Sequence, residues 1–273
     1  MATSAHPKYA VIDDNFPQGW FEFLGNSFVT ELSQADYVIL TDNHVMDNIK
    51  TPRKIALLVE PTSIIPKPYQ YVLQHHDEFQ AILTYNKDVL ALSNSFFCPY
   101  GGGWIQKEDW GLYTKTKNVS IVVSRKCFTD GHKLRHKVLQ SFSNLITESF
   151  GFLNPFSDNC TPYKDFRFCV CIENTKQDYY FTEKVLDCFS TGTVPIYYGC
   201  PSLSKFFDPK GFLTFNTLTE LNGILLRCNE ALYQQMLPGV SENYTRMMNY
   251  WSYQKNIIRA IKDHDDLLNK LCS

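Results

Sequence analysis

The chain has 273 residues, of which 44% are hydrophobic, enough for one large domain or two domains of about 100–150 residues each. Its formal net charge is −2, so it lacks the overall basic field that most nucleic-acid-binding proteins carry. The first residues show no basic stretch followed by an apolar one, and no apolar run is long enough to span a membrane. We therefore expect a soluble cytoplasmic protein without a nucleic-acid partner.

Apolar runs in the first hundred residues predict a series of buried strands. Most of these runs end in Asp, Glu, Asn or Pro, where a strand would stop, and continuous apolar runs of this kind are typical of parallel sheets covered on both faces. The expected strands are residues 8–13, 35–42, 54–60, 79–85 and 93–100.

A glycine-rich and then polar segment, 100–118, predicts a hinge. After it, strands are expected at 118–124, 167–173, 193–199 and 211–216, and helices at 131–146, 182–192 and 217–235. We infer an α/β protein of two Rossmann-like, doubly wound domains that face a cleft. The alternative is a single mixed α/β domain.

The expected division places an acceptor-side domain at 1–105 and a donor-binding domain at 106–249. The remaining residues, 250–273, have helical periodicity and are expected to form a terminal helix that packs back on the first domain.

Residues 171–184, CIENTKQDYYFTEK, join a predicted strand to a predicted helix that begins near Thr182. Lys184 then lies in the first helical turn, where the positive end of the helix dipole disfavours a cation. A bound anion with more than one charge, such as a nucleotide diphosphate, would reverse that preference. Glu183 could accept hydrogen bonds from the two hydroxyl groups of a ribose. The alternative is a solvated Glu–Lys pair on an exposed helix.

A second cation is predicted at the same edge of the second sheet. The strand 118–124 is followed by GHKLRHKV, and Arg135 lies one turn into the expected helix. There a guanidinium could contact a phosphate with two parallel hydrogen bonds. Lys133 and Lys137 fit a simple solvated basic face.

The segment ENTKQDYYFTEKVLDCFSTGTVPIYYGCPSLSKFFDPKGFLTF resembles the C-terminal signature of the α-1,3/4-fucosyltransferases, particularly the short bacterial ones. The shared motifs are E-N-T, Y-x-T-E-K, V-P-I-Y-Y-G-x-P-S and D-P-K-x-F, with a V-V-S that ends at Ser124 upstream. The resemblance covers about residues 118–216. It implies a GT-B fold and a metal-independent, inverting transfer from a nucleotide sugar.

Site residues can be transferred by position from the resemblance. It implies that Arg135 and Lys184 bind the pyrophosphate and that Glu183 binds the ribose. Asn174 and Tyr180 would line the phosphate and sugar region, and Ser124 would also contact the donor.

An inverting transfer needs a base that takes the proton of the acceptor hydroxyl. Glu60 ends the run KIALLVE at the tip of a predicted strand, and we interpret it as that base. The fucosyltransferase-like family has its base at a comparable strand end, although the resemblance is weaker here. His75, His76 and Asp13 are competing or assisting groups. Asp263-His264-Asp265 resembles the D-x-D of metal-dependent glycosyltransferases but lies in the terminal helix, so no metal site is expected.

We therefore expect a glycosyltransferase without a cofactor or metal that moves a sugar from GDP-fucose or UDP-xylose to a hydroxyl of an oligosaccharide or glycoprotein glycan. The size also resembles virus-encoded xylosyltransferases, which would place the protein in the host cytoplasm. The alternative is a nucleotide-sugar-binding protein without transfer activity.

Overall fold

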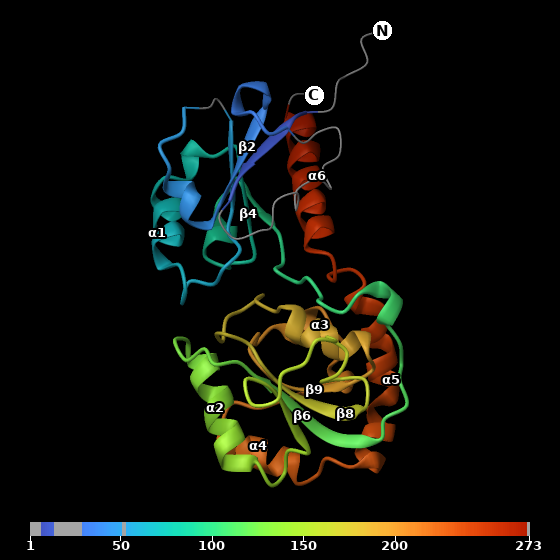
Figure 1. Ribbon diagram of the computed structural model, residues 1–273. Coiled ribbons are helices and arrows are strands. Elements are labelled where there is room, and N and C mark those ends of the chain that lie inside the picture. The colour runs from blue at the N-terminus through green and yellow to red at the C-terminus, as the bar shows by residue number, and fades with distance from the viewer. Residues whose placement is uncertain (1–6, 14–28, 51–52, 272–273) are drawn as a thin grey trace. The chain divides into compact units, whose positions relative to one another are not determined.

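The computed structural model describes residues 7–13, 29–50 and 53–271, with side chains to residue 265 (Figure 1). It divides the chain into two compact units. Unit 1 contains Met1–Tyr100 and Tyr253–Ser273, and unit 2 contains Gly101–Ser252.

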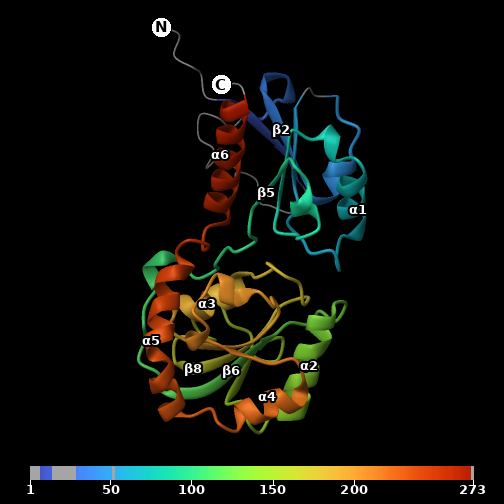
Figure 2. The ribbon, with the colours of Figure 1, turned by 180° about the vertical axis from the view of Figure 1, so that it is seen from behind.

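The sheet of unit 1 consists of five parallel strands whose order follows the chain. The strands are β1 Tyr9–Ile12, β2 Tyr37–Thr41, β3 Lys54–Leu57, β4 Ala81–Thr84 and β5 Ser95–Phe97. One face packs against helix α1, Pro66–Gln74, and the other against helix α6, Tyr253–Leu271 (Figures 1 and 2). The continuous apolar runs of the sequence are thus buried on both faces.

Helix α6 replaces, in unit 1, the second helical layer of a doubly wound sheet. Crossover connections between parallel strands are right-handed. When each new strand is added on the same side of the last one, all of these connections lie on one face of the sheet. The opposite face would stay exposed, and α6 covers it with Tyr253, Ile257, Ala260 and Ile261. Two domains wound on both faces were expected; in unit 1 the second cover comes from the far end of the chain.

The sheet of unit 2 is also parallel, but its order is β10-β9-β8-β6-β7. The chain passes from β6 to its neighbour β7 and then returns to the other side of β6, so the order reverses between β6 and β8. This is the expected doubly wound arrangement. The strands are β6 Lys117–Val123, β7 Glu148–Gly151, β8 Phe166–Ile172, β9 Val194–Tyr198 and β10 Leu213–Thr214.

The helices of unit 2 lie on both faces of its sheet (Figures 1 and 2). They are α2 Asp130–Phe142, α3 Glu183–Ser190, α4 Leu218–Leu225 and α5 Glu230–Met247. The expected helix at 217–235 is in fact two helices, because Asn229 caps a new one by accepting a hydrogen bond from the Leu232 N–H group. Strand β7 and helix α1 are not predicted from the sequence.

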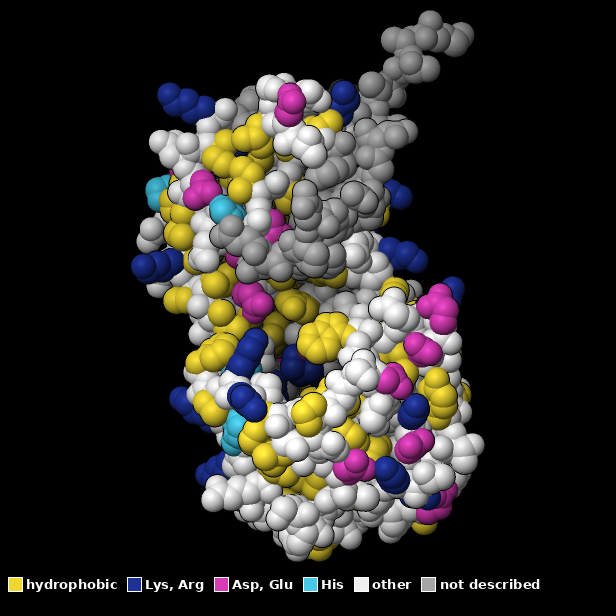
Figure 3. Space-filling view, viewed as in Figure 1, with side chains coloured by type: hydrophobic (Ala, Val, Ile, Leu, Met, Phe, Trp, Pro, Cys, Tyr) yellow, Lys and Arg dark blue, Asp and Glu magenta, His cyan; other side chains and the backbone are white. Residues whose placement is uncertain are grey.

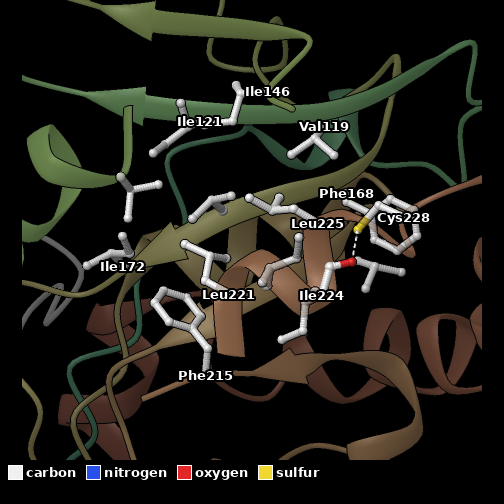
Figure 4. Packing of buried hydrophobic residues seen from close by; sticks show 14 of the residues in the cluster. Val119, Ile121, Ile146, Phe168, Ile172, Phe215, Leu221, Ile224, Leu225 and Cys228 are labelled. Atoms are coloured by element: carbon white, nitrogen blue, oxygen red, sulfur yellow. Dashed lines mark hydrogen bonds between the residues drawn. The ribbon is translucent and has the colours of Figure 1, made fainter. Parts of the chain in front are cut away.

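Strand β8 separates two apolar cores because its side chains alternate between the faces of the sheet. Phe168, Val170 and Ile172 join the cluster beneath α4, which Figure 4 shows with Ile121, Leu221 and Phe215. Cys169 and Cys171 point to the opposite face, where α3 packs with Val185, Leu186, Cys188 and Phe189. Each large side chain buried here contributes about 1.5–3 kcal/mol. The cores therefore fix both the strand and the helix that follows it.

A buried lysine closes the far end of α3. Lys115 Nζ lies within hydrogen-bond distance of four acceptors, which are the carbonyl oxygens of Thr191 (2.7 Å), Lys164 (3.0 Å) and Tyr163 (3.2 Å) and Thr193 Oγ1 (2.9 Å). This one side chain thus connects the C-cap of α3 to the segment before β8.

Replacing Lys115 by Met should lower the free energy of unfolding by about 2–4 kcal/mol, because buried carbonyl groups lose their donors. Chemical denaturation measures the change, and Lys107→Met, at an exposed position, is the matched control. Equal stability of the two variants would contradict the structural role of Lys115.

Candidate functional site

The carboxyl ends of β6 and β8 form a topological switch point, because the chain leaves these neighbouring strands toward opposite sides of the sheet. In open α/β sheets such points hold the ligand. Ser124 follows β6 here, and Glu173 and Asn174 follow β8. The N-termini of α2 and α3 come after the same two strands.

Helix α2 begins in direct contact with the end of β8. Thr129 caps the helix through the His132 N–H group, and the Gly131 N–H group donates to the Asn174 carbonyl oxygen at 3.1 Å. A Cβ atom on Gly131 would lie 1.8 Å from the Glu173 carbonyl oxygen. Only glycine allows this approach of the two backbones.

Arg135 fixes the contact from the next turn of α2. Its Nε donates to the Ile172 carbonyl oxygen at 2.9 Å, and its Nη2 donates to the same oxygen at 2.5 Å and to Asn174 Oδ1 at 2.9 Å. Nη1 makes no hydrogen bond with the described part of the chain. Burial lowers the pKa of the guanidinium, against the opposing influence of Glu173, yet an arginine remains charged.

His132, beside Arg135, is neutral at pH 7. Burial and the charge of Arg135 lower the pKa of His132 to about 4. Its Nδ1 lies 2.6 Å from Thr129 Oγ1 within the cap. It therefore stabilises the start of α2 and adds no charge to the site.

Helix α3 begins at Glu183 with Thr182 as its N-cap, close to the start expected from the sequence, and Gly192 follows its end with a φ of +70°. The cap is bound to a carboxylate that lies outside the helix. Glu173 Oε1 accepts from the Thr182 N–H group at 2.9 Å, and Oε2 accepts from Thr182 Oγ1 at 2.7 Å. Glu173 is fully buried.

The Lys184 ammonium lies between two carboxylates at this helix end. It is 2.7 Å from Glu183 Oε1 and 3.8 Å from Glu173 Oε2, and it donates to Thr182 Oγ1 at 3.1 Å. Burial disfavours its charge, but Glu183 and Glu173 outweigh burial and raise the pKa of Lys184. The unfavourable dipole position is thus compensated by the protein's own acidic groups before any ligand is bound.

The loop between β8 and α3 is held by the segment after β9. Tyr179 adopts a φ of +64°, which is uncommon for a bulky residue, and its N–H group donates to Ser202 Oγ at 3.0 Å. Lys205 Nζ donates to the Tyr179 hydroxyl at 3.1 Å. The next residue, Tyr180, turns inward and is buried.

The structure thus brings most of the predicted donor residues to one sheet edge of unit 2. Ser124 is half-buried beside β6, Arg135 and Asn174 are hydrogen-bonded to each other, and Glu183 is paired with Lys184. One Glu183 oxygen has no partner in the described part of the chain. Their contacts with a donor stay predictions.

The predicted base belongs to unit 1, at the carboxyl end of β3. Glu60 is half-buried, and buried side chains hold its backbone in place. Asp42 Oδ1 accepts from the N–H groups of Val59 (2.7 Å) and Glu60 (3.3 Å). The hydroxyls of Tyr69 and Tyr85 donate to the carbonyl oxygens of Glu60 (2.8 Å) and Val59 (3.1 Å).

Asp42, whose carboxylate accepts a hydrogen bond from the Glu60 N–H group, has a positive φ angle and a raised pKa. Its φ is +46°, a conformation that aspartate tolerates better than most residues. Burial raises the pKa of Asp42 to about 7, and the charges of Glu60 and Asp13 add to the effect. Three acidic residues therefore follow the adjacent strands β1, β2 and β3.

His75 and His76 do not lie near Glu60, which corrects the suggestion that they assist it. They follow α1 and precede β4, at the edge where the strands of the parallel sheet begin. Glu78, next to them, pairs with Lys54, the first residue of β3, at 3.6 Å. Glu60 follows β3 at the opposite edge, as Asp13 follows β1.

The predicted absence of a metal site and of a membrane span can be compared with the described residues only. They contain no cluster of three or more His, Cys, Asp or Glu arranged to hold a metal ion. They also include no helix long and apolar enough to cross a membrane. In Figure 3, basic side chains gather on the side of unit 2 that α2 occupies, whereas basic and acidic side chains are mixed on its other side.

Glu173 belongs to the E-N-T motif but receives no role from the sequence, and Asp42 and Gly131 are not singled out by any pattern. Glu173 directly follows a buried run and Asp42 ends another, so a carboxylate at a strand end was the signal available for both. Nothing local distinguishes Gly131 from any glycine near a helix start, because its constraint comes from the end of β8.

Comparison with known proteins identifies the family. Residues 112–273 match the family described as glycosyltransferase family 10 (fucosyltransferase), C-terminal part. The chain belongs to glycosyltransferase family 10. A 48-residue stretch of this family 10 chain is 46% identical to the alpha-(1,3)-fucosyltransferase FucT of Helicobacter pylori. That match spans 18% of the chain and only 10% of the relative.

Solved structures confirm the expected GT-B fold. An α1,3-fucosyltransferase with GDP-fucose superposes with a TM-score of 0.60 at 16% identity, over 97% of this chain and 92% of the other. The same enzyme type with GDP gives 0.58, over 94% and 90%. A mutant of S. aureus TarM in complex with Fondaparinux, alpha-GlcNAc-glycerol and UDP gives 0.57 at 11% identity, over 90% and 58%.

The contact between Gly131 and β8 can be tested with a pair of glycine substitutions. Gly131→Ala should lower the free energy of unfolding by about 1–3 kcal/mol, because the new methyl group overlaps the Glu173 carbonyl. Gly223→Ala is the matched control: its Cβ atom meets nothing within 4 Å in helix α4, so stability should rise by about 0.5–1 kcal/mol. Thermal and chemical denaturation compare the two, and a neutral Gly131→Ala would refute the close approach.

Proposed function

We propose that this chain is a metal-independent, inverting glycosyltransferase that transfers a sugar from a nucleoside diphosphate sugar to a glycan hydroxyl. The observation that supports it best is the pair of cations, Arg135 and Lys184, at the switch point of a family 10 C-terminal domain. The N-termini of α2 and α3 lie at the same edge. Backbone N–H groups and positive side chains together favour a diphosphate.

In the proposed donor complex, the diphosphate replaces the Glu183 carboxylate as a partner of Lys184. Nη1 of Arg135 reaches a second phosphate oxygen, and Glu183, released from Lys184, accepts hydrogen bonds from the ribose hydroxyls. Asn174 lies next to Arg135 and completes the polar lining. Ser124, at the end of β6, faces the same edge and contributes a hydroxyl.

The transfer itself is a single displacement. The acceptor oxygen forms a bond to the anomeric carbon while the bond from that carbon to the phosphate oxygen breaks, so the configuration inverts. The nucleoside diphosphate leaves with the bonding electron pair, and Arg135, Lys184 and the helix N-termini stabilise its charge. Glu60 takes the proton of the acceptor hydroxyl. A carboxylate on a backbone fixed by Asp42 suits this role, because its position costs little to organise.

We propose GDP-fucose as the donor, since the H. pylori relative is an alpha-(1,3)-fucosyltransferase and one structural neighbour holds GDP-fucose. The acceptor is proposed to be an oligosaccharide or a glycoprotein glycan. UDP-xylose, which a relation to virus-encoded xylosyltransferases would favour, is the competing donor. Thermal-shift measurements with GDP, UDP and their sugars separate the two, because about 100 times the Kd of a ligand adds about 2.7 kcal/mol of stability.

The donor site predicts a loss of GDP affinity when Lys184 is removed. Lys184→Ala should raise the Kd of GDP about 10- to 100-fold, the effect of losing a hydrogen bond to a charged group. Isothermal titration measures it, and Lys107→Ala, at an exposed position outside the site, is the matched control. Unchanged affinity in Lys184→Ala would rule out the proposed donor site.

Removing the proposed base should impair the transfer reaction and leave GDP binding intact, the reverse of what is expected for Lys184. Glu60→Gln should lower kcat about 10²- to 10⁴-fold, because the proton acceptor is lost, while the Kd of GDP stays within about twofold. Glu108→Gln, an exposed glutamate of unit 2, is the control. If Glu60→Gln transfers sugar at the normal rate, Glu60 is not the base. If the unaltered chain binds donors but neither transfers nor hydrolyses any of a panel, the protein is a nucleotide-sugar-binding protein instead.

A further inference from the structure

We propose that Glu173 is a positioning residue, which holds the Lys184 ammonium and the first turn of α3 in the geometry that receives the donor diphosphate. This inference rests on the proposed donor role of Lys184. Glu173 itself is fully buried and is not proposed to touch the donor.

The contacts of Glu173 join three parts of the site. Both carboxylate oxygens accept hydrogen bonds from Thr182, one from its N–H group and one from its hydroxyl. Tyr197 of β9 places its hydroxyl 3.4 Å from Oε1, and the Cys200 N–H group donates to that same hydroxyl. The strand that ends at Ile172, the cap of α3 and the turn after β9 are therefore bound to one side chain.

The space around Glu173 is also closed. A Cβ atom on Gly199 would lie 2.4 Å from the Glu173 Cγ, and one on Gly131 would lie 1.8 Å from its carbonyl oxygen. Glycines thus pack against this residue from both α2 and the turn after β9. A carboxylate so enclosed cannot turn outward to water. Burial raises the pKa of Glu173, and Lys184 and the hydrogen bonds from Thr182 oppose that effect, so the charge of Glu173 depends on groups inside the protein.

Titratable groups face Glu173 from every element packed against it. These are Arg135 of α2, Cys171 of β8, Glu183 and Lys184 of α3, Tyr197 of β9, and Cys200 in the following turn. Arg135 and Lys184 are the two cations among them. Since Arg135 directs its hydrogen bonds to Ile172 and Asn174, Lys184 is the cation that lies against the Glu173 carboxylate, at 3.8 Å.

The pairing has a consequence for Lys184. A lysine side chain is long and flexible, and in a partly buried place it can lose its proton. Glu173 acts from the interior side, where no ligand reaches it, so it can remain paired when the diphosphate displaces Glu183. Lys184 then stays charged and stays in position in both the free and the bound protein.

Glu173→Gln separates the effect of the Glu173 charge on Lys184 from its structural role in capping α3. Gln can still accept the Thr182 N–H hydrogen bond, so Glu173→Gln retains much of the cap but removes the charge. Glu183 and Glu173 together raise the pKa of Lys184 against the effect of burial, and losing one of them lowers that pKa. GDP binding needs charged Lys184, so the affinity for GDP falls when the pH rises above the pKa of Lys184. In Glu173→Gln this fall should begin at a lower pH than in the unaltered chain.

The experiment measures the Kd of GDP for the full chain and for Glu173→Gln over an alkaline series that runs from pH 7 to above the ordinary lysine pKa of about 10.4, because the pKa of Lys184 is raised. We expect the alkaline limb of the pH profile, the range in which GDP affinity falls as pH rises, to move down by about one pH unit. At a fixed pH on that limb, binding is then about tenfold weaker. Glu148→Gln, which removes a half-exposed carboxylate paired with Lys117, is the matched control and should not move the limb.

Two further variants keep the outcomes distinct. Lys184→Gln should abolish the alkaline limb, and adding Glu173→Gln to it should then have no further effect on the pH dependence. If Lys184→Gln binds GDP normally, the proposed donor site fails. If Lys184→Gln weakens binding but Glu173→Gln leaves both affinity and limb unchanged, only the positioning role fails.

A charge-conserving variant covers the case in which Glu173→Gln does not fold. Glu173→Asp shortens the side chain by one methylene and keeps the charge, so the limb should stay in place while GDP affinity falls, because the carboxylate no longer reaches Thr182 and Lys184 together. Wild-type affinity in folded Glu173→Asp would overturn the positioning role.

Discussion

The carboxyl end of β8 is the constraint on which the site of unit 2 depends. Helix α2 approaches it so closely that its second residue is a glycine, and Arg135 hydrogen-bonds the carbonyl group of the last strand residue. One residue later, Glu173 binds the cap of α3. The N-termini of two helices on opposite faces of the sheet are therefore both held by the end of one strand. The reversal of strand order at β6 and β8 makes this arrangement possible.

Charge balance explains why a lysine can occupy the first turn of α3. Its position against the helix dipole costs about 0.3–1 kcal/mol, which two neighbouring carboxylates offset. The four charged groups Arg135, Glu173, Glu183 and Lys184 sum to zero while His132 stays neutral. A nucleotide diphosphate would thus enter a site that is already ordered and compensated, and it would bind by exchanging partners with Glu183.

The two units reach the same layered architecture in different ways. Unit 2 winds its helices on both faces by reversing the strand order, and the reversal leaves a crevice for a ligand. Unit 1 keeps its strands in chain order and takes α6 from the end of the chain to cover the second face. Its sheet edge carries acidic groups instead of cations, and the buried Asp42 holds the backbone of Glu60.

The sequence by itself determined the features that depend on neighbours along the chain. Apolar runs predict most of the strands, Thr182 and Gly192 mark the ends of α3, and the E-N-T and Y-x-T-E-K motifs indicate the family and its candidate donor residues. These signals are local, because strand burial, helix capping and motif spacing each involve residues a few positions apart.

Only the tertiary structure decided which distant groups meet. Arg135 binds a carbonyl 37 residues away, Asp42 binds an N–H group 17 residues away, and Lys115 binds a carbonyl 76 residues away. The order of the strands sets those pairings, and it placed His75 and His76 at the opposite edge from Glu60. No local pattern encodes that order, because it results from how the two faces of each sheet are covered.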